Sequence, residues 1–378
     1  MSSCYQKMSR PPTFVIGEFE IRPESPKTWS FSALRGFEAC PMQWALSRTV
    51  IPCFGSLIPQ KPNRSSVEGT LLHELFECFE RQTRNSNTEM FRPRRTLLGL
   101  VAAWAKRNAS NPRIDSQALA GQVRIEEILR AFGEACSHVK REERQSNVGT
   151  ESVGNRAGFF NGAESWLRDL ESKLCGRADF ISSGEIVDFK SGERHDHHAE
   201  QITFYGALYL ALTGRTPTAL RLVYTATNEI LDVPVPVLSE LKSSLAGMRR
   251  RAVLADQQVS AGELPAKPEP AKCACCHVRG LCDKYWQSLS GSGQGENYLQ
   301  ASVVDYAPTT AATIEPSALG VYVRDIVLGV PSALHLPQEV ANKVGERVGR
   351  MRILALRANT AAEGVRFAFT RNSEVFVS

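Results

Sequence analysis

Two aspartates and a lysine stand close together in the stretch GRADFISSGEIVDFKSG, residues 176–192. Asp179 and Asp188 lie nine positions apart, and Lys190 follows Asp188 after one apolar residue. The Ser-Ser-Gly at 182–184 is typical of a hairpin turn, so we expect two antiparallel strands. Because side chains alternate along a strand, Asp188 and Lys190 point the same way, and Asp179 can reach them across the turn.

Two converging carboxylates repel each other, and without a partner one of them must take up a proton. A divalent cation removes this penalty, and hard oxygen ligands suit Mg²⁺ or Mn²⁺. A lysine beside such a metal can stabilise charge developing on a phosphate, or position or deprotonate an attacking water. The alternative interpretation is an ordinary hairpin with two exposed acids and an ion-paired lysine.

Two expected helices carry further candidate residues. The apolar stripe of SSVEGTLLHELFECFERQ predicts an amphipathic helix with His73 at its flank. AEQITFYGALYLALTG predicts a second helix that ends at a glycine C-cap and places Gln201 and Tyr205 one turn apart. The alternatives are a surface histidine in the first helix and plain packing and capping in the second. Three histidines at 195, 197 and 198 fit a polar loop better than a second metal site.

The cysteines form a third group. Cys273, Cys276 and Cys282 have C-x2-C-x5-C spacing, and Cys40 stands far upstream, directly before Pro41. Four thiolates can hold an iron–sulfur cluster or a structural Zn²⁺, and the spacing does not choose between them. Cys275 is a spare thiol inside the run, so it can replace a neighbour or lie idle.

The whole chain has 378 residues, 42% of them hydrophobic, and a formal net charge of +5. This balance permits a nucleic-acid partner without demanding one. The sequence has no P-loop motif, no apolar run long enough for a bilayer and no segment resembling a signal peptide, so we expect a cytoplasmic protein with no membrane partner. We expect a lead-in over 1–28, a main domain over 29–288, a linker over 289–299 and a small β-rich domain over 300–378. An OB-type barrel that binds single strands through its arginines is one interpretation of the last domain, and ordinary surface charge is the other.

Six motifs occur in a fixed order: WSFSALRGFEACPMQW, GTLLHELFE, GRAD, VDFK, QITFY and CACCHVRGLC. Together they resemble the RecB-type branch of the PD-(D/E)xK nuclease superfamily. The resemblance is strongest to its iron–sulfur members, which include the AddB nuclease domain and the CRISPR adaptation exonucleases. It covers roughly residues 29–287. The fold it implies is α/β and restriction-endonuclease-like, with a central mixed sheet flanked by helices.

The resemblance also implies residue roles. Lys190 would be catalytic with Asp179 and Asp188, and Gln201 and Tyr205 would help bind DNA. The residues that would hold Mg²⁺ or Mn²⁺ are His73, Asp179, Asp188 and Phe189 through its carbonyl. Glu164 would match the acid that the family often has on the strand before its GxxD motif. The residues that would ligate a [4Fe–4S] cluster are Cys40, Cys273, Cys276 and Cys282.

From these roles we expect a metal-dependent deoxyribonuclease, most simply an exonuclease, that hydrolyses phosphodiester bonds in DNA repair, recombination or defence. Its expected partners are DNA and a helicase or another repair or recombination protein. The alternative is a non-catalytic nucleic-acid-binding or adaptor protein that keeps the nuclease fold and a structural metal centre.

Overall fold

The computed structural model describes residues 13–16, 19–21, 23–51, 55–84, 91–146, 162–190, 192–224, 227, 229–288, 299–303, 318–325, 331–337, 351–361, 364–369 and 373–377. The expected linker lies outside these residues except for Leu299, and so do the side chains of the arginines in the C-terminal segment. The chain divides into two compact units. One contains residues 1–23, 36–60 and 262–378, and the other contains residues 24–35 and 61–261.

A mixed β-sheet forms the centre of the unit that contains residues 61–261. Its strands are β2 (Trp29–Ser30), β5 (Gly162–Asp169), β6 (Leu174–Ser182), β7 (Glu185–Lys190), β8 (Ala219–Tyr224) and β9 (Glu229–Val233). The order is β2-β6-β7-β8-β9, with β5 pairing β6. The β2–β6 and β7–β8 pairs are parallel, and the other pairs are antiparallel. The predicted hairpin is therefore present, with β6 and β7 as its strands.

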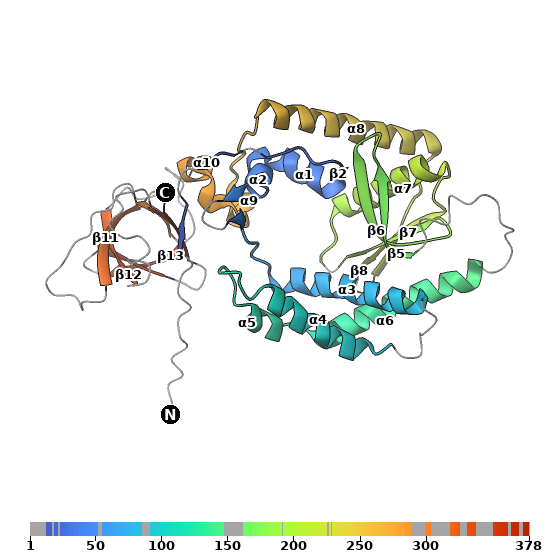
Figure 1. Cartoon of the computed structure of the whole chain (residues 1–378), viewed down its shortest axis with the longest axis horizontal. Helices are drawn as coiled ribbons and strands as arrows, with labels where there is room; N and C mark the ends of the chain where they lie inside the picture. The colour runs from blue at the N-terminus through green and yellow to red at the C-terminus, as the bar shows by residue number, and fades with distance from the viewer. Residues whose placement is uncertain are drawn as a thin grey trace. The chain divides into compact units, whose positions relative to one another are not determined.

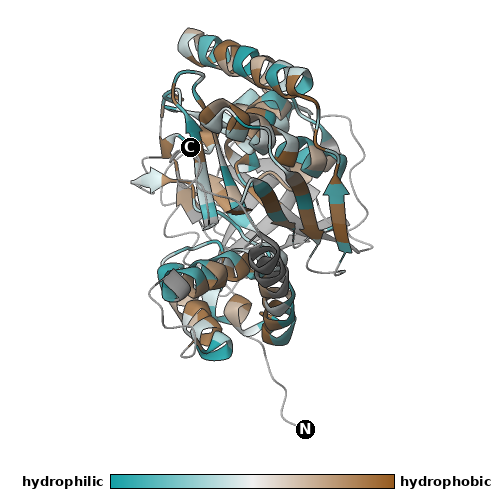
Figure 2. Cartoon of the chain, turned by 90° about the vertical axis from the view of Figure 1, so that its right-hand side faces the viewer, coloured by the Kyte–Doolittle hydropathy of each residue, from teal (hydrophilic) through white to brown (hydrophobic). Residues whose placement is uncertain are grey.

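A group of helices lies on one side of this sheet (Figure 1). They are α3 (Arg64–Arg84), α4 (Pro93–Arg107), α5 (Ser116–Gly121) and α6 (Ile125–Ser146). Phe76 of α3 packs on Phe132 of α6 and stacks on Phe189 of β7, with ring centroids 5.1 and 5.0 Å away. One buried cluster thus joins α3, α4 and α6 to β6, β7 and β8. The strands are largely brown in the hydropathy colouring, whereas the helices alternate between brown and teal (Figure 2).

Two further helices complete this unit. α7 (Asp196–Thr213) connects β7 to β8 and ends at Gly214, whose φ of 71° gives the left-handed conformation expected of a glycine C-cap. Ala207 and Leu210 of α7 pack against Leu241 of α8 (Leu238–Ala261). The α7 helix also approaches β6 closely at Gly176, where an added Cβ would lie 2.7 Å from the Tyr205 ring.

The other unit combines short helices with a seven-stranded sheet. The helical segments are α2 (Pro41–Leu46), α9 (Pro270–Ala274), η3 (Arg279–Leu281) and α10 (Asp283–Ser288), and β3 (Val50–Ile51) pairs β4 (Ser56–Leu57). The larger sheet consists of β1 (Thr13–Val15), β10 (Leu299–Val303), β11 (Ala318–Asp325), β12 (Pro331–Pro337), β13 (Met351–Ala361), β14 (Gly364–Ala368) and β15 (Glu374–Val377). Helix α1 (Phe31–Ala39) spans the boundary between the two units in the sequence.

The predicted fold class, a central mixed sheet flanked by helices, is confirmed. One local expectation differs, because residues 13–15 form a strand inside the segment that we expect to be a loose lead-in. β1 pairs in parallel with β15, and Phe14 packs on Phe376 with ring centroids 5.2 Å apart. A three-residue strand is too short to show an alternating pattern, and its partner lies at the other end of the sequence. No helix among the described residues is long and apolar enough to cross a membrane.

Candidate functional site

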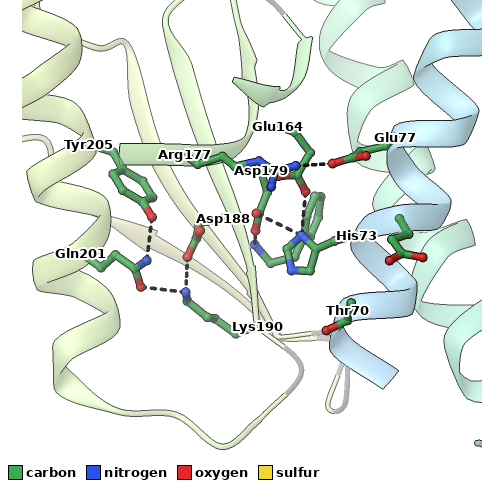
Figure 3. Close-up of a pocket in the computed structure, with 12 residues that line it drawn as sticks. Thr70, His73, Glu77, Glu164, Arg177, Asp179, Asp188, Lys190, Gln201 and Tyr205 are labelled. Carbon is green, nitrogen blue, oxygen red and sulfur yellow. Dashed lines mark hydrogen bonds and ion pairs between the residues drawn. The ribbon is translucent and has the colours of Figure 1, made fainter. Parts of the chain in front are cut away.

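A cavity of about 530 Å³ opens between α3, α7 and the strands β5, β6 and β7 (Figure 3). All of its lining residues belong to the unit that contains residues 61–261. The lining residues are Thr70, His73, Glu74, Glu77, Glu164, Arg177, Asp179, Asp188, Phe189, Lys190, Gln201 and Tyr205. The cavity therefore collects every non-cysteine residue to which the family resemblance assigns a role, together with several others.

Three potential metal ligands meet on one side of this cavity. His73 Nδ1 lies 2.9 Å from Glu164 Oε1 and 3.2 Å from Asp179 Oδ1. Among the described residues, these three form the one group of histidine, cysteine or acidic side chains whose ligand atoms all lie within 4.8 Å of one another. His73 lies on α3, Glu164 on β5 and Asp179 on β6. The two acids face each other within the β5–β6 ladder. Glu164 therefore holds a more central place than the sequence alone assigns to it.

The backbone of the hairpin helps to place the acids. The β6–β7 pairing extends from Ser182–Glu185 to Phe180–Val187, so Asp179 and Asp188 lie just past the last pair. There the Phe189 N–H donates a hydrogen bond of 2.5 Å to Asp179 Oδ2. Glu164, with φ of 52°, adopts the left-handed conformation that a non-glycine residue takes at a cost of roughly 1–2 kcal/mol. Its carboxylate contacts both His73 and Arg177 from this conformation.

A chain of polar contacts crosses the other side of the cavity. Lys190 Nζ lies 2.5 Å from Asp188 Oδ2 and donates a hydrogen bond of 2.9 Å to Gln201 Oε1. The Gln201 amide donates in turn to the Tyr205 hydroxyl at 2.6 Å. Tyr205 is only 6% exposed and packs against Gly176, so it provides a fixed end to the chain. Gln201 and Tyr205 thus position the lysine, and their expected contact with DNA stays a prediction.

The acids create a strongly negative environment. Burial alone lowers the pKa of His73, but the charges of Asp179 and Glu164 and its hydrogen bonds to both raise that pKa to about 10. Burial, followed by repulsion from Asp179, raises the pKa of Asp188 to about 7 despite the neighbouring Lys190. Burial, followed by the charges of Asp188 and Asp179, raises the pKa of the Tyr205 hydroxyl, which therefore stays protonated. The cavity therefore favours positive charge beside these acids.

Arg177 also lines the cavity, although the sequence motifs predict no role for it. Its Nε lies 2.5 Å from Glu164 Oε2, and its guanidinium also pairs with Glu77 of α3. It precedes Asp179 by two positions on β6, so strand alternation places the two on one side of the strand. That alternation is the signal that would have identified Arg177, since the quoted motif GRAD already contains it.

The sequence also matches the family model of the PD-(D/E)XK nuclease superfamily over residues 28–283. The chain belongs to this superfamily. Membership suggests a nuclease, and PD-(D/E)XK nucleases use divalent metals. The (D/E)XK part of the name corresponds to Asp188-Phe189-Lys190 here, while Ala178-Asp179 stands where the name has a proline before the aspartate. Among curated proteins, none matches the chain significantly.

Four of the ten cysteines of this PD-(D/E)XK protein line a second cavity, which lies in the unit that contains residues 262–378. Cys40 is the N-cap of α2, Cys273 lies on α9, and Cys276 and Cys282 flank η3. Burial raises the pKa of the Cys276 thiol to about 11, and the other three cysteines add to the shift. Cys275 is exposed and is not among the lining residues. The structure thus brings together the same four cysteines that the resemblance selects.

The histidines at the start of α7 lie close together but apart from the group at His73. The rings of His195, His197 and His198 have centroids 4.5–5.3 Å apart. His198 is buried, and its Nδ1 lies 3.1 Å from the Tyr224 hydroxyl. Burial, with the positive charges of Lys190 and Arg35 in addition, lowers the pKa of His198 to about 4. His195 is the N-cap of α7, and His197 and His198 lie in its first turn, so the expected polar loop is here the start of the helix.

Proposed function

We propose that this protein is a metal-dependent DNA nuclease, most simply an exonuclease, that hydrolyses phosphodiester bonds at DNA ends in repair, recombination or defence. The observation that carries the proposal is the convergence of His73, Glu164 and Asp179 within 4.8 Å, beside the Asp188–Lys190 pair. DNA is the proposed substrate and partner. A helicase or another repair or recombination protein would supply or process the same ends.

The cavity residues fit Mg²⁺ or Mn²⁺. Their donors are mostly carboxylate oxygens with one imidazole nitrogen, the set that hard divalent cations accept. The proximity of the His73 ring to two carboxylates supports this fit, because Nδ1 lies 2.9 Å from Glu164 and 3.2 Å from Asp179. The side chains that would hold the ion are His73, Glu164, Asp179 and Asp188. Phe189 lines the same cavity and remains the candidate for a backbone ligand.

When bound, the divalent cation would lower the pKa of a coordinated water and neutralise charge on the scissile phosphate. Lys190 Nζ, held by Asp188 and Gln201, would orient an attacking water and stabilise the charge that develops on the phosphate. The water oxygen would form the new bond to phosphorus as the bond to the leaving oxygen breaks, with the water proton lost to solvent and a proton taken up from solvent by the leaving oxygen. Gln201 and Tyr205 would keep the ammonium in place during attack. Arg177 and His73 would balance the charge of the acids before the substrate arrives.

The decisive test is hydrolysis of end-labelled single- and double-stranded DNA with Mg²⁺, with Mn²⁺ and with EDTA. Lys190→Ala and Asp188→Asn should each lower the rate at least roughly a hundredfold, as expected for loss of one preorganised electrostatic group. Lys173→Ala is the matched control, since Lys173 also forms an ion pair, with Asp256, but lies outside the cavity. Metal-independent cleavage, or full activity in Lys190→Ala, would refute the mechanism. Binding without any cleavage would favour the non-catalytic alternative.

We also propose that Cys40, Cys273, Cys276 and Cys282 ligate a [4Fe–4S] cluster. Their joint lining of one cavity supports a shared metal group. Their mutual contributions to the raised pKa of Cys276 support it too, because such crowded thiols become good ligands once a metal replaces their protons. A structural Zn²⁺ on the same four thiolates is the alternative.

The test compares two neighbouring cysteines in anaerobically purified protein. Cys276→Ser should abolish the visible absorbance of the cluster and the bound iron and sulfide, because Cys276 is a half-buried lining residue. Cys275→Ser is the matched control and should retain both, because Cys275 is exposed and outside the cavity. One zinc per colourless chain would overturn the cluster and leave the nuclease proposal standing.

A further inference from the structure

One tryptophan of the chain is exposed. Trp166 on β5 is 48% exposed, whereas Trp29, Trp44, Trp104 and Trp286 are each at most 6% exposed. These are all five tryptophans of the sequence. A single exposed apolar residue needs no functional explanation by itself. The neighbours of Trp166 are what distinguish it.

Two arginines flank the Trp166 ring. The guanidinium carbon of Arg168 lies 4.3 Å from the ring centroid, and that of Arg177 lies 5.8 Å from it. Trp166 and Arg177 are register partners across the β5–β6 ladder, so their side chains lie on the same side. Arg168 follows Trp166 by two positions and shares that side as well. All three side chains are exposed, and together they form one cationic and aromatic surface.

This surface is continuous with the candidate active site. Arg177 contacts the Trp166 ring and also pairs with Glu164, one of the three clustered potential ligands. Within the described part of the sheet, β5 pairs only with β6, so it forms an edge strand that a ligand can approach. A DNA strand that lies along β5 would therefore pass from Arg168 over Trp166 and Arg177 into the cavity.

The chemistry of the surface selects a substrate. An exposed indole offers a π-face on which a nucleobase can stack, and arginines beside it can neutralise the phosphates on either side. The bases of a continuous duplex are stacked on one another and do not present their faces, whereas single-stranded DNA does. We propose that Trp166 stacks on a base of a single-stranded DNA segment, with Arg168 and Arg177 holding its phosphates, and that this strand leads into the cavity. The inference rests on the proposed nuclease function and names the form of DNA that the site takes.

The position of Trp166 allows a direct optical test with the full chain in EDTA, where metal-dependent cleavage cannot proceed. Oligo-dT should quench the intrinsic tryptophan fluorescence, and Trp166→Phe should lose this quenching because the other four tryptophans are buried. In fluorescence anisotropy with labelled oligo-dT, Trp166→Ala should weaken binding about 5- to 100-fold, the range for loss of one stacked base. Trp166→Phe keeps an aromatic face and should bind within about threefold of the wild type.

Two further variants sharpen the test. Arg168→Ala should lower the slope of log affinity against log salt by about 0.7, the value for one phosphate contact on a single strand. Leu98→Ala removes a similarly exposed apolar side chain on α4 and should leave binding unchanged. Circular dichroism of each variant checks that it folds.

The proposal is overturned if Trp166→Ala binds oligo-dT like the wild type, if the quenching persists in Trp166→Phe, or if a blunt duplex quenches equally well. These outcomes are separable from failure of the nuclease proposal. Stacking at Trp166 without hydrolysis by any divalent metal would refute the activity alone. Cleavage of DNA that is insensitive to Trp166→Ala would refute the stacking role alone.

Discussion

Lys190 is held between two neighbours of opposite character, a buried acid and a neutral amide. Its Nζ lies 2.5 Å from Asp188 Oδ2 and donates a hydrogen bond to Gln201 Oε1, and the amide contact fixes its direction. The amide can do this only because the Tyr205 hydroxyl holds its other end. The position of the lysine therefore depends also on Tyr205, which lies one helical turn beyond Gln201 on α7.

Gly176 provides a test of this dependence at the residue scale. An alanine Cβ at this position would lie 2.7 Å from the ring of the buried Tyr205, so Gly176→Ala must displace the tyrosine and then Gln201. Overpacking of this kind costs about 1–3 kcal/mol of unfolding free energy. We expect the rate of DNA cleavage to fall by at least about tenfold as the lysine loses its support.

The matched control for Gly176→Ala is Gly99→Ala in the middle of α4, where no atom lies within 4 Å of the added Cβ. It should leave cleavage unchanged and stabilise the helix by up to about 1 kcal/mol. Thermal unfolding and steady-state cleavage would be measured on both variants. Similar behaviour of the two would show that the close approach of α7 to β6 does not support the lysine.

At the scale of elements, the placement of His73 depends on how α3 is fixed to its neighbours. Glu68, one turn and a half before His73 on α3, accepts hydrogen bonds from Arg124 N and Nε at 3.0 Å, at the start of α6. Its other carboxylate oxygen lies 2.6 Å from the Arg124 guanidinium. A carboxylate at a helix N-terminus also interacts favourably with the helix dipole. Glu68 therefore joins α3 to α6 beneath the site.

Glu68→Gln should reduce the unfolding free energy by about 1–2 kcal/mol at neutral pH, a range that allows for the partial exposure of Arg124. Burial alone raises the pKa of Glu68, but the bonds and charges of Arg124 and Arg64 lower it below the ordinary 4.5. Its contribution is therefore full above pH 4.5 and is lost as the pH falls through the lower pKa of the folded state. Urea unfolding at several pH values should show the wild type and Glu68→Gln converging in acid. A constant difference between them would contradict the assignment.

The sequence reveals this part of the molecule well, because its signals are local. Alternation and a turn motif predict the β6–β7 hairpin, and helical periodicity predicts α3 and α7. These elements are enough to bring the two aspartates, Lys190 and Gln201 together. Contacts between distant segments leave no such signal. The central position of Glu164 depends on a left-handed residue opposite Asp179, and the pairing of β1 with β15 joins the two ends of the sequence. Neither could be inferred from residue spacing.

At the scale of the whole molecule, one hydrophobic core joins segments from the start, the middle and the end of the chain. Phe14 and Ile16 share a buried cluster with Leu46, Val278, Trp286 and Phe376. Cys273, Cys276 and Cys282 pack against the same cluster. The cysteine cavity is thus supported by residues that lie far from it in the sequence.

Phe14→Ala should therefore disturb the cysteine segment. Truncation of a buried phenylalanine costs about 3–5 kcal/mol, and we expect faster hydrogen exchange in peptides covering residues 278–286 and 374–377. Peptides covering residues 67–76, which belong to a different hydrophobic cluster, serve as an internal reference. Leu57→Ala, which truncates an exposed side chain in the same unit, is the control variant. Unchanged exchange at 278–286 would mean that the shared core does not support the cysteine segment.

Among the described residues, the helices α4, α5 and α6 supply no side chain to the lining of the acidic cavity, although they stand between His73 and Glu164 in the sequence. An exposed position of α5 could therefore carry a covalent label or a fused tag without adding any atom to the cavity wall.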